Sequence, residues 1–262
     1  MRRIAVAVSV LLLAAVSVAA QQAGEPVSYL AEFKVKPGQE STFVDLVKKY
    51  DKPVFDKLQA DGAVLAWGLD TRVIHREDGT THVLWWVTKD YAGMDAVFAA
   101  LRQINPPAAD QEKLRAATDL SKHHDHLNRT ILMNVREEEP SAPLYTSWSF
   151  VKVDAGKSGE WRKLFEKYNK PVFDKLVPDG TIFGYGIDVE EFHTDDPGWR
   201  AVWVLTTSLG AFDKIDAAFA ADRQARSEEE RESIGRQFRD ITTPGEHRDS
   251  LWRAVPMKDG GM

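Results

Sequence analysis

The chain has 262 residues, with 34 basic and 40 acidic side chains, a formal net charge of −6 and no cysteine. The absence of cysteine excludes disulfides, thiolate metal sites and cysteine nucleophiles. The acidic balance and the lack of a basic stripe argue against nucleic acid as a partner.

The first twenty residues have the composition of a secretory signal peptide. Two arginines precede an apolar run from Ile4 to Val18, and the small residues Ala19 and Ala20 follow it. This run has about 15 residues, fewer than the roughly 20 that span a bilayer. We therefore expect a cleaved signal peptide over residues 1–20 and an exported protein, periplasmic or secreted, without a membrane span. Loss of the two arginines takes the formal charge from −6 to −8.

The segments that follow predict the order β-α-β-β-α-β. Apolar residues recur every three or four positions from Gln39 to Leu58, which predicts a helix, and two β-rich runs flank a turn-forming cluster after Ile74, which predicts a hairpin. The predicted elements are a strand at 27–35, a helix at 39–58, strands at 64–74 and 81–87, helices at 91–104 and 110–120, and a strand at 127–135.

The chain is an internal duplication. The segment KYDKPVFDKLQADG at 49–62 returns as KYNKPVFDKLVPDG at 167–180, with eleven of fourteen positions identical. An offset of 118 holds well beyond this stretch, so we expect two copies of one folding unit. Their predicted bounds are 26–136 and 144–256, joined by a polar linker at 137–143. The second copy predicts strands at 144–153, 181–193, 199–206 and 250–255, and helices at 158–177, 210–226 and 228–241.

A β-α-β-β-α-β unit folds as a ferredoxin-like sheet with helices on one face and a bare second face. Two units in one chain can press their bare faces together or join edge to edge into an eight-stranded barrel. The chain resembles the dimeric α/β-barrel superfamily, which contains antibiotic-biosynthesis monooxygenase-like, EthD-like and NIPSNAP-like proteins, here fused in tandem. The resemblance implies an α+β fold, a small-molecule cavity enclosed by the barrel, and functions from cofactor-free oxygenation to haem chemistry or plain binding.

Both copies contain the motif KPVFDKL in the first helix. Pro53 and Pro171 cannot donate a backbone hydrogen bond, so we expect the helix to break or kink there, with Asp51 and Asn169 capping the restart. This conservation between copies favours an architectural role. Trp85 and Trp203 are expected to face the helices as core residues.

The repeated aspartates Asp70 and Asp188 lie in the middle of the second strand, on the face opposite its apolar side chains. We expect both to point into the barrel, where a buried carboxylate serves as a catalytic base or an orienting acceptor. The alternative is an exposed strand edge or a structural salt bridge. The same strand alternation makes the barrel-facing side chains His82, Trp86 and Arg200 candidate ligand-binding residues.

The motif H-x-D-x-L-x-R occurs at 123–129 and 247–253, where the last helix is expected to give way to the last strand. A closed antiparallel barrel places the second strand of one copy beside the fourth strand of the other. His75 is therefore expected to approach His247 and Asp249, and His193 to approach His123 and Asp125.

Each such cluster has two readings. Two histidines and a carboxylate suit a divalent metal or proton transfer, with His75 and His193 as candidate catalytic residues. The other reading is a hydrogen-bonded latch between the copies, with Arg129 or Arg253 pairing nearby or contacting a ligand.

Three functions remain open from the sequence. The first is an exported small-molecule-binding barrel, with or without cofactor-free oxygenation of an aromatic substrate. The second is a haem- or metal-binding barrel that uses the paired histidines. The third is a non-catalytic exported binding or structural protein. In each case the two copies pair with each other, in a monomer or a homodimer.

Overall fold

The two copies of the repeat each form four strands and four helices in the computed structural model, which describes residues 24–74, 79–192 and 198–257. The elements of copy one are β1 (Val27–Val35), α2 (Glu40–Tyr50), α3 (Lys52–Ala60), β2 (Val64–Arg72), β3 (His82–Thr88), α4 (Tyr91–Leu101), α5 (Ala108–Ala117) and β4 (Thr118–Val135). Those of copy two are β5 (Tyr145–Val153), α6 (Ser158–Tyr168), α7 (Lys170–Leu176), β6 (Gly184–Glu190), β7 (Trp199–Thr206), α8 (Gly210–Gln224), α9 (Glu228–Arg239) and β8 (Thr242–Ala254).

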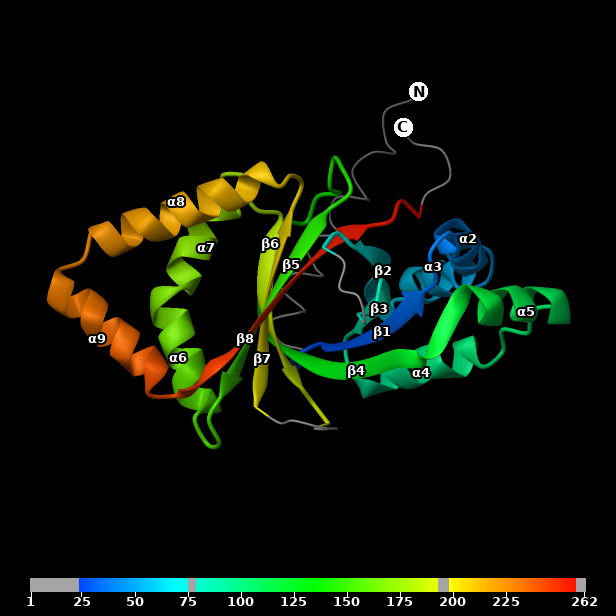
Figure 1. Cartoon of the computed structure of the whole chain (residues 1–262), viewed down its shortest axis with the longest axis horizontal. Helices are drawn as coiled ribbons and strands as arrows, with labels where there is room; N and C mark the ends of the chain where they lie inside the picture. Colours follow the sequence, from blue (N-terminus) through cyan, green and yellow to red (C-terminus); the bar gives the residue numbers. More distant parts are fainter. Residues whose placement is uncertain (1–23, 75–78, 193–197, 258–262) are drawn as a thin grey trace, which may run out of the picture.

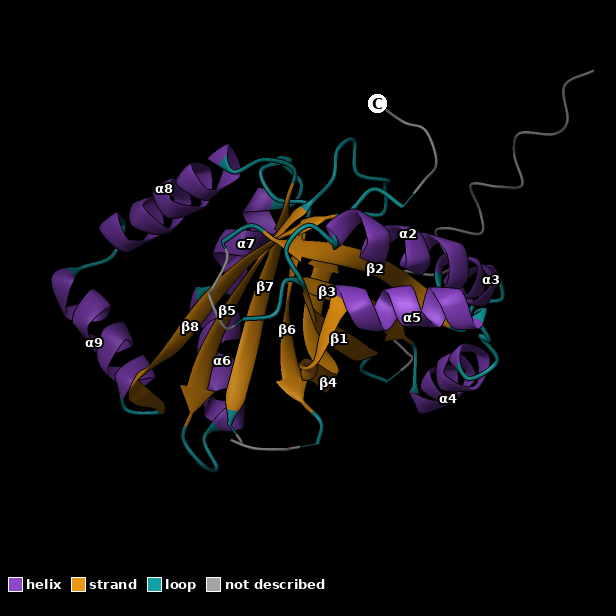
Figure 2. Ribbon diagram, turned by 45° about the vertical axis from the view of Figure 1, so that its right-hand side comes forward, coloured by secondary structure: helices purple, strands orange, loops and turns teal. Residues whose placement is uncertain are grey.

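All eight strands join in one closed barrel in the order β1-β3-β2-β8-β5-β7-β6-β4. The copies meet at two seams, where β2 pairs with β8 and β4 pairs with β6. The expectation that strand two of one copy lies beside strand four of the other is confirmed. The helices of copy two cover one side of the barrel and those of copy one the opposite side (Figures 1 and 2).

Strands β4 and β8 begin earlier than the sequence predicts. The expected starts were residues 127 and 250, whereas the strands start at Thr118 and Thr242. The first part of each strand pairs within its own copy, with β1 or β5, and the last part crosses to the other copy. These partners on both sides hold a polar run in extended form despite its weak strand propensity. Both H-x-D-x-L-x-R motifs therefore lie inside a strand rather than at a helix-strand junction.

The first helix of each copy breaks at the predicted place, before Pro53 and Pro171. The capping role expected of Asp51 and Asn169 is wrong, because neither side chain makes a cap hydrogen bond. Asp51 keeps a helical backbone, with φ −85° and ψ −43°, and its N–H donates to Val47. An N-cap side chain needs an extended backbone to reach the following amides.

The third strand of each copy faces the other way from the sequence prediction. Trp85 packs in the barrel interior with Leu30, Val83 and Trp252, whereas Trp86 belongs to the core under the copy-one helices. The interior has room for the indole because Gly68 lies opposite, where an added Cβ would come within 2.7 Å of the Trp85 ring. Gly186 makes the same space for Trp203 in copy two.

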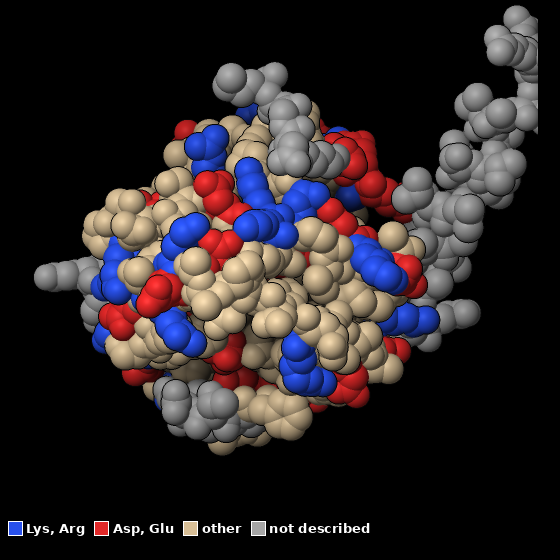
Figure 3. All heavy atoms as spheres, turned by 90° about the vertical axis from the view of Figure 1, so that its right-hand side faces the viewer, with Lys and Arg blue, Asp and Glu red and all other residues tan. Residues whose placement is uncertain are grey.

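The apolar core accordingly has three parts. One lies between the barrel and helices α2 to α4, one between the barrel and helices α6 to α9, and a small one inside the barrel. Across the helical side of copy one, Lys and Arg alternate with Asp and Glu (Figure 3). No helix among the described residues is long and apolar enough to cross a membrane.

Candidate functional site

The two repeated aspartates lie inside the barrel, as expected, and are buried. The carboxylate of Asp188 accepts hydrogen bonds from the Ser28 hydroxyl at 3.0 Å, the Thr130 hydroxyl at 2.8 Å and the Trp203 indole N–H at 3.1 Å. Ser28 and Thr130 belong to copy one, so Asp188 ties the two copies together. Three donors also offset the cost of burying a carboxylate, which favours the structural reading of this residue.

Asp70 has fewer partners than Asp188. Its carboxylate accepts from the Thr146 hydroxyl at 3.4 Å and from the Trp85 side chain, but its Oδ1 has no hydrogen-bond partner. The reason lies across the seam. Thr130 is the strand partner of Asp188, whereas the partner of Asp70 is Ala254, which carries no hydroxyl.

Burial raises the pKa of both carboxyl groups, and that of Asp70 reaches about 6. Asp188 also lines a cavity of about 330 Å³ inside the barrel. The charged residues around this cavity have both signs and include Glu32, Arg72, Glu190 and Arg248. The barrel interior therefore contains hydrogen bonds that link the two copies and a small polar cavity.

Three of the residues expected to bind a ligand inside the barrel do not face its interior. His82 and Trp86 point toward the copy-one helices, where His82 contacts the Phe43 ring at 5.2 Å and Trp86 donates to the Met94 sulfur at 3.0 Å. Arg200 donates to the Ser158 hydroxyl at the start of α6. The prediction failed because both faces of the third strand are rich in large side chains, so alternation alone gave the wrong face.

The two predicted arginines contact residues beside the seams. Arg129 forms a two-point ion pair with Glu191 of copy two, with N–O distances of 2.8 and 2.9 Å. Arg253 stacks over the Tyr145 ring at 5.5 Å. Neither lines a cavity described below, and the Arg129 pair acts as a link between the copies.

Each H-x-D-x-L-x-R motif brings its own histidine and aspartate together. His123 Nε2 lies 3.2 Å from Asp125, and His247 Nε2 lies 3.3 Å from Asp249. His75 and His193 lie outside the described residues, so the expected approach of His75 to His247 and of His193 to His123 stays a prediction. Among the described residues, no group of three His, Asp or Glu side chains could hold a metal ion.

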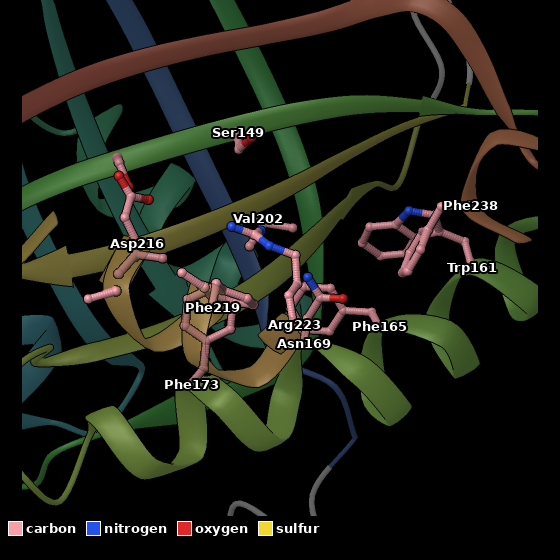
Figure 4. A pocket seen from close by; sticks show the side chains of 14 residues that line it. Ser149, Trp161, Phe165, Asn169, Phe173, Val202, Asp216, Phe219, Arg223 and Phe238 are labelled. Atoms are coloured by element: carbon pink, nitrogen blue, oxygen red, sulfur yellow. The ribbon is translucent and has the colours of Figure 1, made fainter. Parts of the chain in front are cut away.

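One hollow lies between the sheet and the helices of copy two, and we name it the copy-two pocket (Figure 4). Its volume is about 850 Å³. Strands β5 and β7 form its floor, and helices α6 to α9 form its walls. It is lined by Ser147, Ser149, Trp161, Phe165, Asn169, Phe173, Val202, Val204, Asp216, Ala217, Phe219, Ala220, Arg223 and Phe238.

Aromatic rings make up most of the wall of the copy-two pocket. Phe165 stacks between Trp161 and Phe173, with ring centroids 5.5 and 6.1 Å away. Phe219 from α8 meets Phe173 edge to face at 5.1 Å. Such rings favour a flat, apolar guest, which can stack on their faces or meet their edges.

The pocket differs from its counterpart in copy one because two large rings have been replaced. In copy one, Tyr29 stacks on Trp86 at 4.5 Å and contacts Phe98 at 5.2 Å, which fills the space beneath α4. At the offset of 118, Tyr29 and Trp86 become Ser147 and Val204, both lining residues of the copy-two pocket. Phe98 is retained as Phe219, since MDAVFAA of α4 aligns with IDAAFAA of α8. Helix α8 is also longer than α4, with 15 residues against 11.

Five polar residues line the copy-two pocket, namely Ser147, Ser149, Asn169, Asp216 and Arg223. Asp216 and Arg223 project from α8, and Figure 4 shows the Arg223 side chain reaching toward the sheet near Val202. Arg223 has no ion pair within the described chain, whereas the nearby Arg226 is held by Asp222. On the floor, the Ser149 hydroxyl lies 2.9 Å from His247 Nε2. The pocket thus offers a cation without an ion pair in the described chain, a carboxylate, and a serine hydroxyl that contacts His247, which does not itself line the pocket.

The residues that line the copy-two pocket do not suit a haem group. Haem iron takes an axial ligand from His, Cys, Met or Tyr, and none of these is among the described residues that line the copy-two pocket. The corresponding hollow of copy one has His123, Tyr50 and Tyr29, but all three are engaged, Tyr29 through a hydrogen bond with Asp125. His123 contacts the Glu32 carbonyl and Asp125 through its two nitrogens, and Tyr50 donates to Asp110.

No protein-family model matches the sequence, and no curated protein matches it significantly. Solved structures match the fold. A protein from Fusobacterium nucleatum, provisionally described as a monooxygenase, superposes with a TM-score of 0.59 at 9% identity, over 91% of this chain and 96% of its own. A similarly described protein from Lactobacillus acidophilus gives 0.58 at 10%, over 89% and 95%. A haem-binding protein from Thermus thermophilus gives 0.53 at 10%, over 89% and 92%. The chain has the fold of the dimeric α/β-barrel superfamily, as the sequence predicted.

The copy-two pocket was missed because the sequence comparison looked for residues that the copies share. The useful signal was a difference: Tyr29 and Trp86 in copy one correspond to a serine and a valine in copy two. A change from large rings to small residues at two equivalent positions predicts a hollow in the second copy.

The raised pKa of Asp70 predicts a specific pH dependence of stability. Because the folded pKa of about 6 exceeds the unfolded value of 3.8, folding takes up a proton between these pH values. Asp70 therefore destabilises the fold above pH 6, and this cost disappears as the pH falls toward 4. Compared with Asp70→Asn, the wild type should gain roughly 3 kcal/mol of unfolding free energy between pH 7.5 and pH 4. Denaturant titrations at both pH values measure this gain.

Ala254→Thr is the matched control for this prediction. It supplies a hydroxyl at the position that Thr130 occupies beside Asp188, so it should lower the pKa of Asp70 and reduce the gain at low pH. If the unfolding free energies of the wild type and of Asp70→Asn change with pH in the same way, the pKa of Asp70 is not raised in the folded protein.

Refilling the copy-two pocket should hinder entry of an aromatic probe without unfolding the protein. The double variant Ser147→Tyr, Val204→Trp restores the residues of copy one, and it should weaken binding of 1-naphthoate at least tenfold by occupying its space. Calorimetric titration measures the affinity, and circular dichroism checks the fold. Ser147→Ala, which leaves the space open, should bind nearly as well as the wild type. Unchanged binding by the folded double variant would place the ligand elsewhere.

Proposed function

We propose that this protein binds a flat aromatic small molecule that carries an acidic group, in the copy-two pocket. The observation that carries the proposal is the pocket itself: about 850 Å³, walled by aromatic rings, at a position where copy one has large rings instead. Ligand sites typically occupy about 300–1,000 Å³ and combine apolar walls with a few placed polar groups.

Arg223 is the reason for proposing that the ligand carries an acidic group. Its guanidinium lines the pocket without an ion pair in the described chain, and guanidinium groups bind carboxylates through two parallel hydrogen bonds. Asn169, Ser147 and Ser149 add neutral hydrogen-bonding groups along the same space. A ligand whose ring lies between the aromatic walls and whose acidic group faces Arg223 contacts both the apolar and the polar lining residues.

Arg223→Gln should weaken binding of 1-naphthoate about tenfold, a loss of ~1.4 kcal/mol. The neutral analogue 1-naphthalenemethanol should bind the variant and the wild type alike, since it lacks the carboxylate. Isothermal titration calorimetry gives both affinities. Arg226→Gln is the control, because Arg226 lies nearby but is already paired with Asp222. Equal weakening of 1-naphthoate by the two variants would remove Arg223 from the site.

A second candidate function is cofactor-free oxygenation of a bound phenol. Asp216 lines the pocket and can take its proton directly, and His247 can take it through the Ser149 hydroxyl, 2.9 Å from its Nε2. The electron-rich phenolate then reduces O₂. One oxygen atom enters the ring, and the other leaves as water with two hydrogens from the substrate. For 1-naphthol the balance is naphthol plus O₂ giving 1,4-naphthoquinone plus water. The monooxygenase descriptions of two structural neighbours support this reaction class.

Incubation with 1-naphthol under ¹⁸O₂ tests this second function. Mass spectrometry should find one labelled oxygen atom per quinone, and Asp216→Asn with His247→Gln should slow product formation at least tenfold. If labelled quinone forms no faster than in a protein-free control, the protein binds 1-naphthol without oxygenating it.

Export is a further part of the proposal. Arg2, Arg3 and the apolar run to Val18 support a signal peptide over residues 1–20. Protein recovered from the periplasm or medium should have Gln21 as its first residue by mass spectrometry, whereas an intact Met1 in that protein would contradict cleavage.

A further inference from the structure

A second hollow of about 680 Å³ lies between the sheet and the helices of copy one. We name it the copy-one pocket. It lies where the copy-two pocket lies in the other repeat, although the Tyr29, Trp86 and Phe98 cluster fills part of the space. Its aromatic walls include Phe33 and Phe43, and it opens beside α2 and α5.

The copy-one pocket has a carboxylate where the copy-two pocket has a neutral amide. At the offset of 118, Asn169 of the copy-two pocket corresponds to Asp51, which lines the copy-one pocket. The Asp51 carboxylate makes no hydrogen bond to another residue and no ion pair within the described chain. Burial raises the pKa of Asp51 to about 6, so the group is ionised at pH 8.

The other two carboxylates around this pocket already have partners. Asp110 accepts from Lys49 at 2.7 Å, Tyr50 at 2.6 Å and Lys113 at 2.8 Å. Asp125 lies 3.2 Å from His123 Nε2 and also interacts with the Tyr29 hydroxyl. The remaining ionisable lining group, Arg115, is exposed on α5. Asp51 is therefore the acid that has a charge to offer a guest.

We propose that the copy-one pocket is a second ligand site, selective for an aromatic amine whose ammonium group pairs with Asp51. The ring of the guest lies against the aromatic walls, and its cation is favoured both by the carboxylate and by the negative faces of Phe43, Trp86 and Phe98. The duplicated chain thus has two pockets of common origin and opposite preference, one for an acid at Arg223 and one for an amine at Asp51.

Titration with 2-phenylethylamine at pH 8 tests the proposal. The wild type should bind one equivalent, and Asp51→Asn should weaken this binding at least tenfold. The neutral 2-phenylethanol should bind both proteins equally, which distinguishes loss of the charge from damage to the fold. Arg223→Gln, which acts in the copy-two pocket, should leave amine binding unchanged.

Asn169→Asp provides a gain-of-function arm, since it places the carboxylate of copy one in the copy-two pocket. It should raise the stoichiometry for the amine from one to two. Amine binding that survives Asp51→Asn, or that falls with Arg223→Gln, would overturn the second site. Failure of 1-naphthoate to bind would instead count against the proposed function of copy two and leave the amine result standing.

Discussion

Closure of the barrel across its two seams is the constraint on which the structure depends. A ferredoxin-like unit leaves one face of its sheet bare, and each copy here covers that face with the other copy. Strands β4 and β8 are long enough to pair within their own repeat and then cross to the next. Inside the closed barrel, Asp188 receives hydroxyl donors from the opposite repeat, so a buried carboxylate helps to specify how the copies fit together.

This closure frees the helical side of each copy for function. Since the barrel interior is largely taken by Trp85, Trp252 and the carboxylate ties, the larger hollows lie between sheet and helices. Duplication then allows the hollows to diverge, because either copy can change its lining while the shared barrel remains. The replacement of Tyr29 by Ser147 and of Trp86 by Val204 opens the pocket of copy two, and the exchange of Asp51 for Asn169 changes the charge of its lining.

The fold could be predicted from the sequence, whereas the site could not. The repeat and its helical and strand periods sufficed for the element order and for the pairing of β2 with β8. Strand alternation failed where two tryptophans are adjacent, at Trp85 and Trp86, since either one can serve as core. Only the glycine opposite, Gly68, reveals which indole faces inward. The histidine clusters depended on His75 and His193, which lie outside the described residues, and the pocket depended on differences between copies rather than identities.

The function proposed for the copy-two pocket depends on where an aromatic acid binds. The most direct measurement is a crystal structure of the protein with 1-naphthoate. The predicted result is ligand density in the copy-two pocket, with the ring against Phe173 and Phe219 and the carboxylate on Arg223. Density inside the barrel beside Asp188, with the copy-two pocket empty, would contradict the account and return the function to the interior carboxylates.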